Sequence, residues 1–144
     1  MAYGIALKKS GASVEGCFGG EWPARCLFSL DPLLIKRLGE LIVALAAGKK
    51  KRFEIHLEAK NNGLYVLGKR NFYRGSTLIR FEFDSVHPHF RVPCHNRFNY
   101  DRFTNEELLT FGRALINFDN TGIARIGEEN SADFVRSFEE ELLI

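Results

Sequence analysis

Hydrophobic and polar residues alternate most clearly between Lys51 and Asp84. The alternation predicts three consecutive strands, at Arg52 to Lys60, Leu64 to Phe72 and Thr77 to Asp84. In the first strand the apolar positions are Phe53, Ile55, Leu57 and Ala59, and the polar positions are Arg52, Glu54, His56, Glu58 and Lys60. Asn62-Gly63 predicts a tight hairpin turn, because both residues tolerate a positive φ. We therefore expect an antiparallel meander with one dry and one wet face.

A helical pattern precedes the meander, from Pro32 to Ala47. Its apolar stripe consists of Leu34, Leu38, Leu41 and Leu45, widened by Ile35 and Ile42. Asp31 is suited to cap the helix, Pro32 to its first position and Gly48 to its end. We expect this stripe to pack on the dry face of the meander rather than to line a ligand cavity.

The other expected elements are shorter. Further strands are predicted at Tyr3 to Lys8, Val14 to Phe18, Trp22 to Ser29 and Ile123 to Ile126. A capping box of Thr104 and Glu107 begins a second helix, which ends at Asn120 to Gly122. Ser131 begins a third helix. Between the meander and the second helix, Ser85 to Phe103 is expected to be irregular.

The predicted fold class is α+β. We expect a single domain over residues 1–144, in which an antiparallel β-meander packs against one central apolar helix and two C-terminal helices. The meander would belong to one sheet of about four to six strands. With 45% hydrophobic residues the chain is suited to a packed core, and it has no apolar run long enough to span a membrane. The first residues lack the pattern of a signal peptide, so we expect a cytoplasmic protein with reduced cysteines.

Charge is distributed unevenly along the chain, although the net charge is only +2. Lys49 to Arg80 contains nine Lys or Arg residues against two Glu, whereas Thr104 to Ile144 contains three Arg against nine acidic residues. Two interpretations remain open. The acidic end either packs against the basic sheet, or the basic stretch is a surface for an acidic partner.

Basic and aromatic residues are interleaved in Lys69 to Arg74 and in Arg97 to Phe103. This mixture suits single-stranded nucleic acid, because cations bind phosphates and rings stack on bases, and it equally suits a protein interface. We assign Phe72, Phe98 and Phe103 to the core. The candidate binding residues are Lys49, Lys50, Lys51, Lys69, Arg70, Tyr73, Arg74, Arg97, Tyr100 and Arg102.

Three of the four histidines lie close together with a cysteine. Imidazole and thiolate are the usual ligands of zinc, so the candidate metal ligands, for zinc or another divalent cation, are His87, His89, Cys94 and His95. The alternative interpretation is a surface loop with a buried thiol. Separately, Glu58-Ala59-Lys60 matches the Glu-x-Lys element of metal-dependent nucleases, for which Asp84 would have to supply the second acid.

Asp84, followed by His87-Pro88-His89 and Pro93-Cys94-His95, resembles the histidine-rich segment that follows a strand in small proteins of bacterial toxin–antitoxin loci. The resemblance covers only this segment and implies an accessory protein of a bacterial or phage conflict system. The sequence contains no glycine-rich phosphate loop, G-x-S-x-G or H-E-x-x-H motif. We expect a small non-catalytic binding protein, without a cofactor, that engages nucleic acid or an acidic protein. The alternative is a metal-dependent hydrolase or nuclease that uses the four candidate ligands.

Overall fold

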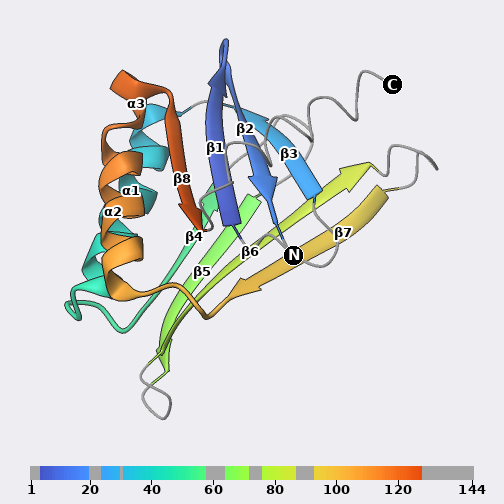
Figure 1. The fold of residues 1–144 in the computed structure, drawn as a ribbon. Coiled ribbons are helices and arrows are strands. Elements are labelled where there is room, and N and C mark those ends of the chain that lie inside the picture. Colours follow the sequence, from blue (N-terminus) through green and yellow to red (C-terminus); the bar gives the residue numbers. More distant parts are fainter. Residues whose placement is uncertain are drawn as a thin grey trace.

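The computed structural model describes residues 4–19, 24–29, 31–57, 64–71, 76–86 and 93–127. Over these residues the chain forms two antiparallel four-stranded sheets and three helices (Figure 1). The N-terminal sheet, in the order β3-β2-β1-β8, contains β1 (Gly4–Ser10), β2 (Ser13–Phe18), β3 (Ala24–Ser29) and β8 (Ile123–Gly127). The meander sheet, in the order β4-β5-β6-β7, contains β4 (Arg52–Leu57), β5 (Leu64–Asn71), β6 (Ser76–Val86) and β7 (Pro93–Tyr100). The helices are α1 (Pro32–Ala46), α2 (Asn105–Ile116) and α3 (Phe118–Thr121).

The meander sheet has the two faces that the alternation predicts. Phe53 and Leu57 of β4 are buried, while Arg52, Glu54 and His56 between and beside them are exposed. The same division continues on β6, where the buried residues are Thr77, Ile79, Phe81 and Phe83. The α+β class and the predicted meander are therefore confirmed over the described residues.

The expectation of an irregular segment from Ser85 to Phe103 is wrong for much of its length. The first two residues extend β6, and Pro93–Tyr100 pairs with β6 as strand β7, in a register that sets Phe98 opposite Phe81. Pro93 is tolerated because it is the first residue of an edge strand, where a missing N–H removes no ladder hydrogen bond. The prolines and histidines of this segment obscured an alternating pattern that the strand does contain.

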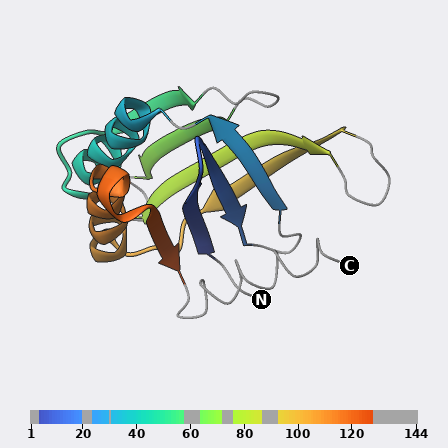
Figure 2. The same ribbon diagram turned by 90° about the horizontal axis from the view of Figure 1, so that it is seen from above.

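The structure has two facing sheets where the sequence predicted one. A helix is about 10 Å wide, whereas four strands about 4.8 Å apart are wider, so one helix does not cover the dry face of the meander sheet. The N-terminal sheet covers the remainder (Figure 2). Phe18 of β2 lies between the sheets, with its ring centroid 4.9 Å from that of Phe81 and 5.0 Å from that of Phe83. The Tyr100 hydroxyl of β7 donates a hydrogen bond to the carbonyl of Gly19, at 2.9 Å.

The helices begin as the sequence predicts. The Asp31 side chain accepts a hydrogen bond from the Leu33 N–H, at 3.0 Å, and α2 starts with the capping box of Thr104 and Glu107. Helices α1 and α2 pack side by side and close one flank of the two sheets (Figures 1 and 2). The helix predicted from Ser131 lies outside the described residues. None of the described helices is long and apolar enough to cross a membrane.

Candidate functional site: a basic end

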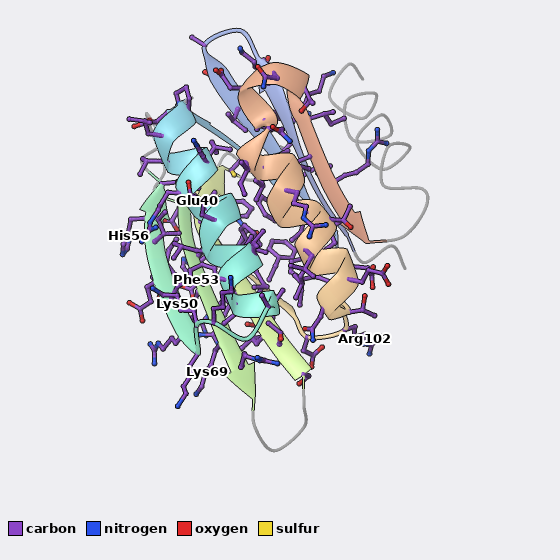
Figure 3. The ribbon with its side chains drawn as sticks, turned by 90° about the vertical axis from the view of Figure 1, so that its left-hand side faces the viewer. Glu40, Lys50, Phe53, His56, Lys69 and Arg102 are labelled. Atoms are coloured by element: carbon purple, nitrogen blue, oxygen red, sulfur yellow. The ribbon has the colours of Figure 1, made fainter. Side chains whose placement is uncertain are left out.

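Six cations gather where α1 ends, β4 begins and β5 ends. We call this surface the basic end, and it consists of Lys49, Lys50, Lys51, Arg52, Lys69 and Arg70. The pairing of β4 with β5 sets Lys69 directly opposite Arg52, and the Arg70 N–H donates to the carbonyl of Lys51, at 3.0 Å. Lys50 and Lys69 lie at the same end of the molecule (Figure 3). Two stretches separated in sequence, residues 49–52 and 69–70, are thus brought together.

The turn after α1 holds the three lysines in place. The carbonyl of Ala44 accepts hydrogen bonds from the N–H groups of Lys49, at 2.9 Å, and Lys50, at 3.2 Å. Gly48 has φ 79°, and a Cβ built there would lie 2.6 Å from Nη1 of Arg70. The positive φ favours glycine at this position, whereas the Arg70 guanidinium is the end of a flexible side chain and can move aside. The Arg70 guanidinium lies against the C-terminal turn of α1, where its charge also complements the negative end of the helix dipole.

Most of the charge at the basic end faces solvent. Lys49, Lys51, Arg52 and Lys69 are exposed, and Lys50 and Arg70 are half-buried. Glu54 forms an ion pair with Arg52, and this partner holds the pKa of the Glu54 carboxyl below its ordinary range. The charge of Arg52 is therefore offset by the Glu54 carboxylate, which remains ionised. Sequence reasoning omitted Arg52 from the candidate residues, although its position directly after Lys51 was the available signal.

Arg97 lies on β7, two strands away from Lys69 of β5 on the wet face of the meander sheet. Its Nε is 2.8 Å from Oε1 of Glu82, which it faces across β6 and β7. Arg80 lies near the same carboxylate, with 3.9 Å between its Nη1 and Oε1 of Glu82, and donates through Nε to Oδ1 of Asn99, at 2.7 Å. The charge of Arg97 is thus balanced within a cross-strand network, and Arg97 does not extend the basic end.

Tyr100 is not a surface residue, contrary to its assignment as a binding candidate. Its side chain is only 4% exposed, because its position on β7 points it between the two sheets. Burial raises the pKa of its hydroxyl group. Tyr73 and Arg74 lie outside the described residues. Arg102 is exposed, but Figure 3 shows it across the helix pair from Lys50 and Lys69.

The hollow nearest Arg102 is small. It is lined by residues 99–103 and has a volume of about 30 Å³. This is about the share of liquid volume that one water molecule takes. The hollow does not accommodate a substrate of ordinary size.

The histidine-rich segment is described only in part. Nδ1 of His95 lies 3.0 Å from Oδ1 of Asp84, and its Nε2 lies 3.8 Å from Oε2 of Glu82. His87, His89 and the side chain of Cys94 are outside the part that the structure describes, as are Glu58 and Lys60. Among the described residues, no three His, Cys, Asp or Glu side chains are grouped to hold a metal ion. Cys17 and Cys26 are both buried.

Comparison of the chain with protein-family models, with curated proteins and with solved structures found no match. The protein is therefore classified by its own structure. It is an α+β protein with two facing sheets and a pair of helices, and it has a basic end.

Proposed function

We propose that this protein is a non-catalytic binding protein that engages an acidic partner, nucleic acid or protein, through its basic end. The supporting observation is the register of β4 and β5, which sets Lys69 directly opposite Arg52. This register adds Lys69 and Arg70 to the lysines of the turn after α1, so cations from two stretches of the chain face solvent together, although Glu54 offsets the charge of Arg52. A negatively charged partner is attracted to such a concentration of positive charge.

The wider context follows from the histidine-rich segment. Since residues 84–95 resemble a segment of proteins from bacterial toxin–antitoxin loci, we assign the protein to the accessory proteins of bacterial or phage conflict systems. Toxin–antitoxin, immunity and anti-defence proteins are all such accessory proteins. The sequence carries no recognised phosphate-loop or nucleophile motif, which favours binding over catalysis.

The test is a matched pair of charge reversals. Lys49→Glu with Lys69→Glu reverses two exposed cations of the basic end, whereas Lys9→Glu with Lys36→Glu makes the same charge change elsewhere. Lys36 lies about 15 Å before the end of α1 at Ala46, along the helix axis. The probes are fluorescein-labelled duplex DNA of about 20 base pairs and poly-L-glutamate, measured by anisotropy at about 50 mM salt.

We expect wild type to bind at least one probe. The basic-end pair should weaken binding at least about tenfold, and the control pair less than about threefold. All three proteins should have the same melting temperature within about 2 °C, because the four lysines are exposed. Equal losses in the two pairs, or no binding of either probe by wild type, would overturn the proposal.

One observation favours the alternative, a metal-dependent hydrolase or nuclease. Nδ1 of His95 lies 3.0 Å from Oδ1 of Asp84, so one imidazole and one carboxylate are adjacent, although the described residues do not by themselves form a three-ligand group. His87, His89 and Cys94 would complete the site for zinc or another divalent cation. Elemental analysis after dialysis tests it. An ion retained in stoichiometric amount by wild type and lost in His95→Ala would support the alternative, and metal-free protein that leaves RNA and DNA intact would exclude it.

A further inference from the structure

We infer that the basic end binds the phosphate backbone of double-stranded nucleic acid, largely independently of sequence. This inference rests on the proposed binding function and specifies its partner. Three properties of the basic end support this inference. They are its residue types, the burial of the neighbouring aromatic side chains and the arrangement of its cations on the surface.

The composition favours phosphate over an acidic protein surface. Four of the six residues are lysines. Protein interfaces are depleted in Lys and enriched in aromatic residues, whereas a lysine ammonium is a hydrated point charge that suits phosphate oxygens. Phe53, the ring that follows Arg52, is only 4% exposed and points into the core. A protein partner would therefore meet no aromatic anchor on the described part of this surface.

The neighbouring rings favour a duplex over a single strand. Proteins that bind single strands stack the bases on exposed aromatic side chains. Tyr100 is buried, and Phe98 and Phe103 pack against the core as half-buried residues. A duplex needs no such platform, because its bases already stack on one another and its phosphates face outwards. Tyr65 is half-buried on the wet face, where it packs against His56, four residues before the basic end on β5. The described rings at the basic end itself therefore leave charge as the means of binding.

The display of the cations predicts weak dependence on base sequence. They are carried by a turn and by the ends of two neighbouring strands, over roughly 10 Å. A DNA duplex carries one negative charge per about 1.7 Å of its axis, counting both strands, so this length of duplex contains about six phosphates, of which a surface on one side meets a part. Contacts to phosphates position a protein on a duplex without reading bases. If four cations each neutralise one phosphate, log K should fall with log salt concentration with a slope of about −3.6.

The experiment measures anisotropy with five labelled probes between about 50 and 200 mM salt. They are a DNA duplex of about 20 base pairs, a scrambled duplex of the same composition, an RNA duplex, a single strand of equal length and poly-L-glutamate. Lys49→Ala and Lys69→Ala are the test variants, and Lys36→Ala is the control.

We expect a duplex to bind at least about tenfold more tightly than the single strand or poly-L-glutamate, with the scrambled duplex equal within about twofold. Each test variant should make the slope about one unit shallower, and the control should not change it. A single strand that binds as tightly, or a strong preference between the two DNA duplexes, would overturn the inference while leaving the proposed function intact. Tighter binding of poly-L-glutamate would overturn it in favour of an acidic protein partner. Failure to bind any probe would overturn both.

Discussion

Tyr100 connects the two sheets through its buried hydroxyl group. This group lies 2.9 Å from the carbonyl oxygen of Gly19 and 3.4 Å from that of Gly4. Tyr100→Phe removes the donor and leaves buried carbonyl groups without it, so we expect the free energy of unfolding at pH 7 to fall by about 1–3 kcal/mol. Urea denaturation followed by far-UV circular dichroism measures the change. An unchanged midpoint would mean that the hydrogen bond contributes nothing.

The same residue predicts a change of stability at high pH. Burial raises the pKa of Tyr100 above its ordinary value of 10.0, so above pH 10 the unfolded chain releases this proton while the folded protein keeps it. The folded state then binds more protons, and stability falls as pH rises, by about 1.4 kcal/mol per unit for this one group. Tyr100→Phe lacks the group. The difference in stability between wild type and variant should therefore narrow between pH 9.5 and about 11, and a constant difference would contradict this.

Burial also raises the pKa of the Cys26 thiol above its ordinary value of 9.0. The loss of stability from this thiol therefore begins near pH 9 in both proteins and cancels in their difference. Cys26→Ser introduced into both the wild type and the Tyr100→Phe protein provides the control, because the thiol is then absent from both sides of the comparison.

Lys69 and Arg97 are both exposed cations of the meander sheet, but their surroundings differ. Glu82 balances Arg97 at 2.8 Å, whereas Lys69 lies opposite the like charge of Arg52. We expect Lys69→Ala to weaken duplex binding at least about threefold, and Arg97→Ala to change it less than about twofold. Anisotropy titration of both variants with the same duplex, at one salt concentration, compares the two losses of affinity. A larger effect of Arg97 would move the binding surface to the part of the wet face around Glu82 and Arg97 on β6 and β7.

This pair of residues shows what the sequence predicts at the scale of single side chains. The mixture of basic and aromatic residues predicts that Arg97 is a surface residue, but the segment around it is expected to be irregular, so Arg97 is not placed on the wet face of a strand from the sequence. Its pairing with Glu82 depends on the register of β6 with β7, which no local pattern gives. Tyr100 was misassigned for a related reason, since the facing sheet that buries it comes from residues far away in the sequence.

Helices α1 and α2 approach closely at two glycines. A Cβ built on Gly39 would lie 2.6 Å from the carbonyl oxygen of Gly112 and 2.9 Å from the backbone nitrogen of Ile116. Backbone atoms do not move aside as a flexible side chain does. Gly39→Ala gains about 1 kcal/mol in helix propensity, but overpacking costs about 1–3 kcal/mol or more at a backbone contact. We expect a net loss of stability, measured as a lower melting temperature.

Glu40→Ala is the matched control for this prediction. It introduces the same residue one position along α1, at an exposed site. The control should change the melting temperature by no more than about 2 °C, because surface substitutions are usually close to neutral. A Gly39→Ala protein that melts at the same temperature as the control, or higher, would show that the two helices separate at little cost.

At the scale of elements, the sequence predicts those defined by local patterns. Helix α1 has a cap, a proline at its first position and an apolar stripe, and the meander has a clean alternation, so both are found as predicted. The pairing of β1 with β8 joins Ile5 to Ile126, and no periodicity reveals a partner so distant in sequence. The division into two sheets therefore could not be predicted.

The basic end exists only at the scale of the whole molecule. The sequence shows an excess of cations between Lys49 and Arg80 but does not say which of them meet. Pairing of β4 with β5 brings Lys69 to Arg52, and the turn after α1 adds the three lysines. Arg80, from the same basic stretch, is instead used within the wet face. Folding thus separates the cations of this basic stretch: Arg80 bonds to neighbouring side chains of the sheet, whereas the residues of the basic end are displayed together at the surface.

One core joins the sheets and the helices, and this predicts cooperative unfolding. The buried cluster includes Phe18 of β2, Phe81 of β6, Leu38 of α1 and Phe111 of α2. Phe18→Ala removes the ring that lies between the sheets, so we expect the free energy of unfolding to fall by about 3–5 kcal/mol, a large part of the 5–15 kcal/mol typical of domains.

Because the cluster is shared, the unfolding transitions followed by the helix signal in far-UV circular dichroism and by the aromatic signal in the near-UV should shift together. Phe18→Leu, which keeps most of the volume, should cost less in both. If Phe18→Ala shifts the aromatic transition and leaves the helix transition in place, the helix pair folds without the sheets, and the basic end at its junction with β4 and β5 is not rigidly held.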